Sequence, residues 1–339
     1  MNSTMSSDRS VLIRGDGVAA YCCAHLLANA GFRVAMERPD RPRVPAIMLS
    51  DAALALIRDV FGQPSLFAEL PRIARRVVQW GEAADPVSLP HSAVVVSETF
   101  LLESLAPVFE TDAGSAPAFT VYTSRPLPAA ATEHRFGARH AAAAQVALRD
   151  PADLSGCWIE SLENGWLFLI PNAAQSTWLL AVGGPLESLL ESSRVIAPRV
   201  NLLGGRSGEF ATCPRILSPL CGDGWLACGT VAMAFDPICG DGTAQSVREA
   251  ILAAAVVRGI ADGGDAAGLF SHYEMRLTAA MLRHLTLCAD FYRTGGKSSW
   301  WQAELQSLEA GYRWCADKLA AAGEPRYQLR DFVLERRPG

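Results

Sequence analysis

Lysine is nearly missing from this sequence of 339 residues, because only Lys297 and Lys318 among its 30 basic residues are lysines. No lysine before position 297 is therefore available for catalysis. The net charge of -5 comes from scattered residues and gives no basic patch for nucleic acid or an anionic membrane. No apolar run approaches the roughly 18 residues of a membrane span, and the first ten residues lack the apolar centre of a signal peptide. We therefore expect no nucleic acid or membrane partner and a cytoplasmic location.

Paired cysteine motifs are also lacking. The nine cysteines stand at irregular spacings, and none of them forms a CxxC pair. In a chain of this length, an odd number of cysteines without a framework predicts reduced and mostly buried thiols. Disulfides and a zinc site are not expected, and we predict no metal. The sequence also offers no Ser/His/Asp triad, no histidine cluster with metal-ligand spacing and no P-loop.

The residues that are present describe a globular chain. They are 50% hydrophobic and 19% charged, which excludes disorder, a coiled coil and collagen and allows one large or two small domains. Residues 11–15 and 32–37 have the pattern of short strands, and residues 18–30 between them have helical spacing that ends at Gly31. Helices are also predicted over 50–61, with Ser50 or Asp51 as the N-cap, and over 97–109, and strands are predicted over 75–81 and 92–96.

The middle of the chain changes character. Residues 111–144 are rich in Ala, Thr, Pro and Ser, with one clear strand over 119–123, and they resemble a surface excursion more than a core. Strands dominate afterwards, over 145–148, 157–161, 166–170 and 176–182, with a hairpin turn at Asn164-Gly165. A strand at 225–228 and helices over 243–260 and 266–292 follow. The predicted fold class is α/β. Residues 1–110 and 205–339, with the C-terminal helices, form a Rossmann-like domain, and 111–204 form a β-rich substrate subdomain.

The first motif with chemical meaning lies between the opening strand and helix. It reads Gly15-x-Gly17-x-x-Ala20, and Glu37 ends the next strand 20 residues after Gly17. Gly15 allows a tight turn, Gly17 lets a pyrophosphate approach the backbone, and Ala20 permits close packing of helix and strand. The helix N-terminus faces the phosphates, and Glu37 accepts hydrogen bonds from ribose hydroxyls. The alternative is a glycine-containing turn of an ordinary α/β protein.

A second glycine-rich segment follows the strand at 225–228 and precedes a predicted helix. Its pattern is Gly229-x-x-Ala232-x-x-x-Asp236-Pro237-x-x-Gly240-x-Gly242. Such a loop presents backbone amides and a helix dipole to an electron-rich group, such as one edge of a reduced flavin. A plain glycine-rich loop is the alternative interpretation.

These two motifs together resemble the FAD-binding pattern of the aromatic-hydroxylase and tryptophan-halogenase superfamily of flavoproteins, over about residues 11–260. The resemblance implies that FAD is the cofactor and that the β-rich subdomain covers the substrate pocket. Gly15, Gly17, Ala20 and Glu37 would then hold the ADP half. The ribityl and ring half would be contacted by Thr230, Asp236, Gly240 and Gly242. The family usually has Gly-Asp where this chain has Gly229-Thr230, so a threonine hydroxyl would have to replace the carboxylate that holds a ribityl hydroxyl.

A third match covers residues 165–171 and is similar to the halogenase signature W-x-W-x-I-P, with Phe168 in place of the second tryptophan. The resemblance places Trp166, Phe168 and Pro237 at the substrate pocket. Halogenases use a lysine in the first third of the chain, which this sequence lacks, so halogenation is disfavoured while the architecture is retained. A hydrophobic hairpin strand that ends in proline fits residues 165–171 equally well.

The chain is shorter than typical halogenases and resembles a compact branch of the superfamily, the flavoprotein maturases of tryptophylquinone enzymes. That branch hydroxylates a protein-bound tryptophan. The segments that give the impression are Trp80-Gly81, Leu89-Pro90-His91 and Phe136-Gly137-x-Arg139.

Single residues give weaker predictions. His91 could donate to flavin or substrate, although a lone histidine is more often structural. Asp236 could tune protonation beside the flavin, or it could only cap the turn before Pro237. We name His91 and Asp236 as candidate catalytic residues. Trp300 and Trp301 are expected to pack the C-terminal helices.

The predicted function is a flavin-dependent monooxygenase, an oxidoreductase that hydroxylates an aromatic small molecule or a tryptophan within a partner protein. No second GxGxxG occurs, so electrons would come from transiently bound NAD(P)H or from a separate flavin reductase. Two alternatives stay open. One is a nucleotide-binding scaffold of the same fold without redox turnover, and the other is a flavin dehydrogenase or reductase.

Overall fold

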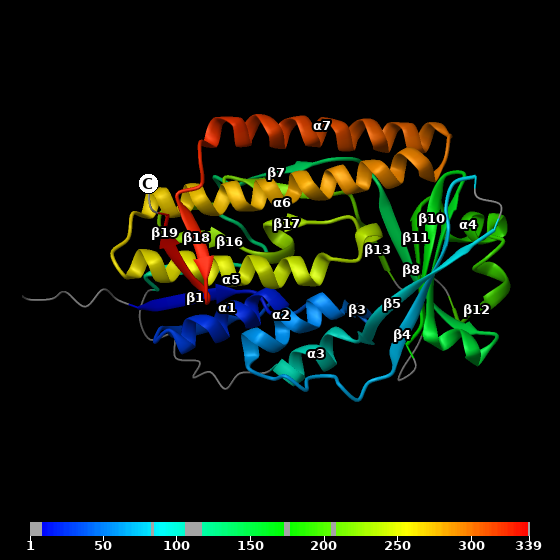
Figure 1. The fold of residues 1–339 in the computed structure, drawn as a ribbon, viewed down its shortest axis with the longest axis horizontal. Coiled ribbons are helices and arrows are strands. Elements are labelled where there is room, and N and C mark those ends of the chain that lie inside the picture. Colours follow the sequence, from blue (N-terminus) through cyan, green and yellow to red (C-terminus); the bar gives the residue numbers. More distant parts are fainter. Residues whose placement is uncertain (1–8, 83–84, 106–116, 173–176, 205–207, 338–339) are drawn as a thin grey trace, which may run out of the picture.

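The computed structural model describes residues 9–82, 85–105, 117–172, 177–204 and 208–337. It is a mixed α/β fold built around two sheets, with long helices covering one of them (Figure 1). The helices are α1 (Val18–Asn29), α2 (Asp51–Phe61), α3 (Glu98–Leu105), α4 (Leu186–Ser192), α5 (Gly242–Ala261), α6 (Ala266–Gly295) and α7 (Ser299–Ala322). None of these helices is long and apolar enough to cross a membrane.

A five-stranded sheet carries the βαβ opening. Its order is β15-β16-β6-β1-β2, and β2, β1, β6 and β16 run parallel. The strands are β1 (Ser10–Arg14), β2 (Arg33–Glu37), β6 (Phe119–Tyr122), β15 (Cys221–Gly222) and β16 (Trp225–Ala227). Because parallel strands end at the same sheet edge, the glycine turn after β1 lies beside the end of β2. This is the Rossmann-like unit that the sequence predicts.

A nine-stranded sheet forms the second layer, on the right of Figure 1. Along its main path the order is β12-β8-β11-β10-β9-β4-β5-β3, and β13 also pairs with β8. The strands are β3 (Ile47–Ser50), β4 (Arg72–Gln79), β5 (Val87–Val96), β8 (His140–Leu148), β9 (Gly156–Leu162), β10 (Gly165–Ile170), β11 (Thr177–Gly183), β12 (Val200–Leu202) and β13 (Gly208–Ala211). Strand β10 lies at the centre and is buried on both faces apart from its last residue.

The remaining strands are short. A three-stranded sheet contains β7 (Thr132–Arg135), β14 (Arg215–Ser218) and β17 (Met233–Ala234). A C-terminal hairpin of β18 (Tyr327–Arg330) and β19 (Val333–Arg336) lies over α5 (Figure 1). Helices α6 and α7 pack against each other along the length of the molecule.

Two sequence predictions need correction. The boundaries at 110 and 205 do not separate the two sheets, because β6 from 111–204 joins the five-stranded sheet, whereas β3, β4 and β5 from 1–110 join the nine-stranded one. The stretch 111–144 is also more than a surface excursion. It supplies β6, β7 and the start of β8, and it contains the fully buried Arg139. The alanine-rich composition predicted a surface segment wrongly, because alanine fits the interior of a crowded sheet as well as it fits a loop.

Local predictions elsewhere hold well. Ser50 caps α2 by accepting a hydrogen bond from the amide of Ala53, and Glu37 ends β2. The hairpin between β9 and β10 is confirmed. Predicted residues 106–109 of the helix at α3 and residue 176 of the strand at β11 lie outside the described residues. The sequence did not define the structure after residue 292, where the chain continues into the long helix α7 and the C-terminal hairpin.

Candidate functional site

The first glycine turn joins β1 to α1. Gly15 has a φ of +141°, and a Cβ atom there would overlap Oγ1 of Thr123. The Gly15 amide donates a hydrogen bond to the carbonyl of Glu37 at 2.9 Å, which ties the ends of β1 and β2 together. Glycine is therefore required at this turn, for both backbone conformation and space.

The N-terminus of α1 is open. Gly17 is its N-cap residue and no side chain caps the helix, so the first amides stay available to an anion. Ala20 is fully buried, which keeps the helix close to the sheet. The carboxylate of Glu37 is 60% exposed and lies 2.9 Å from Nε of Arg14. The structure thus brings Gly15, Gly17, Ala20 and Glu37 to one edge of the five-stranded sheet.

Two arginines and two buried acids surround this helix end, and sequence reasoning missed all four. Nε of Arg41 lies 2.9 Å from Oδ1 of Asp16, and its NH1 donates to Oε2 of Glu98 at 2.9 Å. NH1 of Arg43 lies 2.6 Å from Oδ2 of Asp16. A Cβ on Gly17 would stand 3.7 Å from Arg41 and 4.0 Å from Glu98. Both a cation and an anion therefore border the place where phosphate would meet α1.

The protonation of this cluster follows from its contacts. Burial alone would raise the pKa of Glu98, but hydrogen bonds from Arg41 and from the Val44 amide, with the arginine charges, bring that pKa below its ordinary value. The hydrogen bond to Glu98 raises the pKa of Arg41. Glu98 is therefore ionised at neutral pH. The Arg-rich stretch after Glu37 was the one sequence signal that could have pointed to this cluster.

The second glycine segment lies directly against the first. Gly229 has a φ of +70°, and a Cβ atom there would stand 2.7 Å from Cβ of Ala19 in α1. Next to it, Cys228 Sγ is 4.0 Å from Cys23 Sγ. The Gly229 amide donates to Oε2 of the buried Glu249 at 2.9 Å. Two glycine turns far apart in the sequence thus converge at α1.

The residues after Gly229 lead to the N-terminus of α5. Thr230 is exposed. The carboxylate of Asp236 accepts a hydrogen bond from the amide of Ile238 at 2.9 Å, so this residue caps the short helix η4 (Pro237–Cys239). Gly240 follows with a φ of +64°, and Gly242 is the first residue of α5.

The nine-stranded sheet reaches this loop through β3, β4 and β5. A Cβ on Gly240 would lie 3.5 Å from a guanidinium nitrogen of Arg76 and 3.9 Å from Met48. Burial, followed by the charge of Arg76, lowers the pKa of His91 on β5. Nε2 of His91 is buried and has no hydrogen-bond partner in the structure. His91 is therefore a neutral imidazole close enough to feel the charge of Arg76, and its Nε2 has no partner among the described residues.

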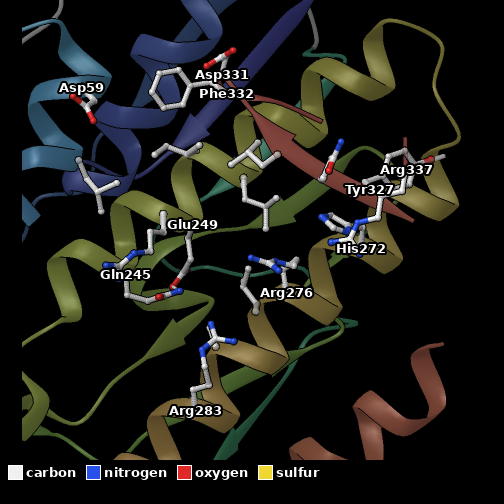
Figure 2. A pocket seen from close by; sticks show the side chains of 18 residues that line it. Asp59, Gln245, Glu249, His272, Arg276, Arg283, Tyr327, Asp331, Phe332 and Arg337 are labelled. Carbon is white, nitrogen blue, oxygen red and sulfur yellow. Dashed lines mark hydrogen bonds between the residues drawn. The ribbon is translucent and has the colours of Figure 1, made fainter. Parts of the chain in front are cut away.

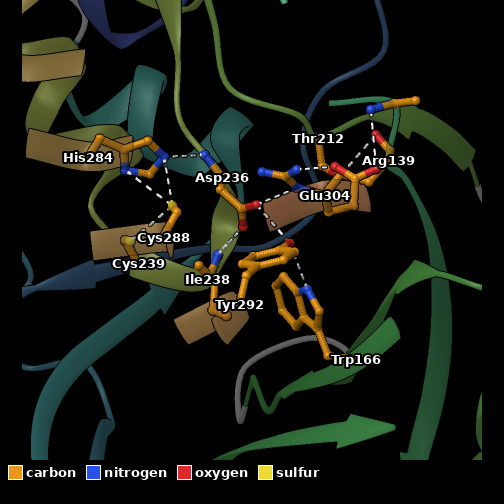
Figure 3. A network of polar contacts seen from close by, with 11 residues as sticks. Arg139, Trp166, Thr212, Asp236, Ile238, Cys239, His284, Cys288, Tyr292 and Glu304 are labelled. Carbon is orange, nitrogen blue, oxygen red and sulfur yellow. Dashed lines mark hydrogen bonds and ion pairs between the residues drawn. The ribbon is translucent and has the colours of Figure 1, made fainter. Parts of the chain in front are cut away.

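Asp236, the other candidate catalytic residue, belongs to a buried polar network (Figure 3). Its Oδ2 accepts hydrogen bonds from Nε of Arg139 at 2.7 Å and from the hydroxyl of Tyr292 at 2.9 Å. Arg139 also pairs with Glu304 of α7 and lies over the ring of Tyr292, 4.6 Å from its centroid. Nε1 of Trp166 donates to the Tyr292 hydroxyl at 3.2 Å. Sequence reasoning missed Tyr292 and Glu304.

The electrostatics of the network keep the guanidinium of Arg139 charged and the phenol of Tyr292 neutral. Burial opposes the charge of Arg139, but Tyr292, Asp236 and Glu304 outweigh it and raise the pKa of the guanidinium. Burial and the charge of Asp236 raise the pKa of Tyr292, which stays a phenol and donates. Because the carboxylate oxygens of Asp236 already accept three hydrogen bonds, this arrangement favours a positioning role for it.

Of the three residues predicted at the substrate pocket, Trp166 and Pro237 lie at this network. Trp166 and Phe168 of β10 are buried, at 0% and 4% exposure, and Pro237 in η4 is partly exposed. Trp166 contacts the network directly, so it lies beside the predicted ring half of the site. The expected packing role of Trp300 and Trp301 is confirmed for Trp301, which is 1% exposed.

A cluster of possible metal ligands lies on the other side of Asp236. One ligand atom each of Cys239, His284 and Cys288 falls within 4.8 Å of the others. The two Sγ atoms are 3.8 Å apart, and Cys288 Sγ is 3.3 Å from Nε2 of His284. That Nε2 accepts a hydrogen bond from the Asp236 amide at 2.7 Å, and its ring stacks on Phe235. We predicted no metal from sequence; only the His284–Cys288 spacing of one helical turn pointed to this group.

Comparison with known proteins bears on the fold. No family model matches the chain, and no curated protein matches it. Among solved structures, the myxobacterial chondrochloren halogenase CndH is 16% identical with a TM-score of 0.72, over 91% of this chain and 90% of that one. The peptidyl tryptophan dihydroxylase QhpG is 17% identical with a TM-score of 0.68, over 97% and 86%. The p-nitrophenol 4-monooxygenase PnpA from Pseudomonas putida is 12% identical with a TM-score of 0.61, over 92% and 97%. The chain therefore has the fold of FAD-dependent halogenases and monooxygenases.

Proposed function

We propose that this protein is a flavin-dependent monooxygenase, an oxidoreductase that hydroxylates an electron-rich aromatic substrate. The observation that carries the proposal is the close approach of Gly229 to Ala19, which brings two glycine turns to one end of α1. An ordinary glycine-containing turn would need no partner turn of this kind. The nine-stranded sheet approaches Gly240, further along the same glycine-rich segment, through Arg76 and Met48, which makes a crevice between two layers the expected site.

The chain's own residues fit FAD at three points. Gly15 and Gly17 leave the backbone bare at an uncapped helix end, where a pyrophosphate would bind, and the exposed Glu37 would hold the ribose. Thr230, Gly240 and Gly242 would contact the ribityl and ring half, because they are the glycine-loop residues near the N-terminus of α5. The buried, unpartnered Nε2 of His91 offers a hydrogen bond from the sheet side. Bound and reduced FAD would supply the activation of molecular oxygen.

The protein's part is to hold the crevice rigid and to keep water out of it. Asp236 fixes the loop before α5 by capping η4 while it pairs with Arg139. Tyr292 and Trp166 connect that loop to the central strand of the nine-stranded sheet. Buried aromatic walls of this kind exclude water from a reacting centre. His91 would orient flavin or substrate as a neutral imidazole.

The substrate class is an aromatic small molecule or a tryptophan within a partner protein. The likeness to QhpG, which covers 97% of this chain, favours the peptidyl tryptophan. NAD(P)H or a separate flavin reductase would supply electrons. Incubation of the reduced protein with tryptophan-containing peptides should add oxygen atoms to the indole, as read by mass spectrometry. Bromide added together with the peptide should give no brominated product.

The first experiment asks whether FAD is held. Purified protein is mixed with FAD, desalted and examined by visible absorbance, and we expect a yellow protein. Gly17→Val should lose the colour and keep the unfolding temperature, because Gly17 has an ordinary φ and flexible neighbours while its new side chain would block the phosphates. Gly208→Val, at an exposed position where no atom of the described residues lies within 4 Å of the new Cβ, is the control and should stay yellow. A wild type that stays colourless would refute the proposal.

A scaffold without redox turnover is the second candidate, and the cluster at α1 favours it. Asp16 and Glu98 place two carboxylates against the arginines that would meet a pyrophosphate, which weakens the attraction for FAD. Oxygen uptake and peroxide release after reduction separate the candidates. A monooxygenase should exceed free flavin in both, a scaffold should not, and a dehydrogenase or reductase should reoxidise slowly.

A further inference from the structure

A large cavity lies along α5 and meets the second glycine turn through Glu249, whose Oε2 accepts a hydrogen bond from the Gly229 amide. Its volume is about 760 Å³, within the range of small-molecule sites. Helices α2, α5 and α6 and the C-terminal hairpin form its walls (Figure 2). Apolar side chains line much of it, among them Leu56, Ile251, Leu252, Leu277 and Phe332. Nothing in the proposed flavin chemistry uses this cavity.

Its polar lining is strongly basic, in a protein whose net charge is -5. Arg248, Arg276, Arg283 and Arg337 all line it. Arg248 pairs with Asp241 at 2.8 Å, whereas within the described part of the chain Arg276 and Arg283 form no ion pair. Burial, followed by the charges of Arg276 and Arg248, lowers the pKa of Arg283. Arg276 and Arg283 are therefore held near each other and near Arg248, and neither has a carboxylate partner among the described residues.

A buried histidine adds a second, independent feature. His272 is only 4% exposed and lines the cavity, and no described residue forms a hydrogen bond with its Nδ1. Burial and the charges of Arg276 and Arg337 lower its pKa to about 4, so the imidazole is neutral at neutral pH. An orphaned buried nitrogen costs free energy unless a ligand satisfies it.

The acidic residues at the cavity do not cancel this charge. Asp59 and Asp331 lie at its exposed rim. Glu249, the buried acid, has a pKa raised to about 8 by burial, against the hydrogen bonds from Gln245 and the Gly229 amide. It is therefore mostly protonated at neutral pH. Arginines beside apolar walls suit a ligand that has an anionic group at one end and an apolar part at the other.

We propose that the cavity is a second binding site, for a small organic phosphate whose phosphoryl oxygens meet Arg276 and Arg283 while its apolar part lies against the leucines. Arginine suits phosphate because its planar fork donates two parallel hydrogen bonds. His272 supplies a further hydrogen bond. A carboxylate of the same shape offers fewer oxygens for the same arginines and should bind more weakly.

The test uses 1-naphthyl phosphate, 1-naphthoate and inorganic phosphate as probes, measured by isothermal titration calorimetry. The protein is saturated with FAD or carries Arg41→Gln, so that the helix end of α1 does not compete for phosphate. We expect naphthyl phosphate to bind at least tenfold more tightly than the other two probes. Arg276→Gln and Arg283→Gln should each weaken it about tenfold, whereas Arg313→Gln on the exposed side of α7 should leave it unchanged.

Thermal unfolding without probe separates binding from a structural role. Because Arg283 is repelled by its neighbours, Arg283→Gln should unfold at the same or a higher temperature than the wild type. Loss of binding together with retained stability supports the site. Equal binding of naphthyl phosphate by the wild type and both variants, or no binding at millimolar probe, overturns the proposal. Neither result depends on whether the protein hydroxylates anything.

Discussion

At the scale of single residues, the site is defined by where charges are buried. Glu98 and Asp16 lie at the helix end that the dinucleotide motif reserves for phosphate, and Arg41 is shared between them. The pattern Gly15-x-Gly17-x-x-Ala20 does not specify these acids. If the proposed function holds, the strength of FAD binding would depend on residues that the glycine pattern does not specify.

Glu98→Gln tests this dependence. The glutamine side chain can still accept the hydrogen bond from the backbone amide of Val44. It removes one negative charge near the phosphates and weakens the attraction that holds the Arg41 guanidinium. We expect roughly three- to tenfold tighter FAD binding by fluorescence titration, the effect of one partly screened charge at close range. Glu103→Gln, on the exposed face of the same helix, is the matched control. Weaker binding in Glu98→Gln would mean that the carboxylate is needed to position Arg41.

Cys239 gives a second prediction at this scale. The hydrogen bond from Cys288 lowers its pKa to about 6, against burial and with help from His284. Because the thiolate is the reactive form, alkylation by iodoacetamide with a chelator present should rise through pH 6 and level off above pH 7. An ordinary thiol would still be gaining rate there. Cys288→Ala should move the midpoint to higher pH, and a midpoint near 8.5 in the wild type would contradict the geometry.

At the scale of elements, local patterns were predictable and pairings were not. The strand, glycine turn and helix at β1 and α1 follow from spacing within thirty residues, and Ser50 caps α2 as its sequence indicates. The place of β6 between β1 and β16 depends on parallel pairing with a distant strand, which periodicity does not contain. Arg139 ends the segment Phe136-Gly137-x-Arg139, but its partners Asp236 and Glu304 lie far away in sequence. Its burial could not be predicted from composition.

Helix α5 yields a prediction about pH. Glu249 has a pKa of about 8 in the folded protein and an ordinary value near 4.5 when unfolded. Its contribution to stability is complete below the unfolded value and is lost as pH rises toward 8, because the unfolded chain ionises first. The slope is at most about 1.4 kcal/mol per pH unit.

Urea unfolding of the wild type and Glu249→Gln at several pH values between about 5 and 8 measures this effect. The glutamine keeps an acceptor for the Gly229 amide and cannot ionise, so the variant should gain stability relative to the wild type as pH rises. Glu191→Gln on an exposed helix should show no such trend. A difference between wild type and Glu249→Gln that is constant with pH would show that the carboxyl is ionised in the folded protein.

At the scale of the whole molecule, one buried network connects both layers. Arg139 precedes β8, Asp236 lies before α5, Tyr292 is in α6 and Glu304 is in α7. Trp166 in β10 connects the network to the centre of the nine-stranded sheet through its hydrogen bond to Tyr292. We therefore expect the relative position of the glycine loop and the sheet to depend on the guanidinium of Arg139, which lies between two carboxylates.

Arg139→Met tests that dependence. The substitution removes the cation and leaves Asp236 and Glu304 buried without it, and such breaks cost about 3–5 kcal/mol. The triple variant Arg139→Met, Asp236→Asn, Glu304→Gln removes the uncompensated charges and should recover much of the loss in urea unfolding. Because stranded carboxylates prefer to be protonated, the single variant should weaken further as pH rises from about 5 to 8. A single variant within about 0.5 kcal/mol of the wild type would mean that the layers hold their positions through apolar packing alone.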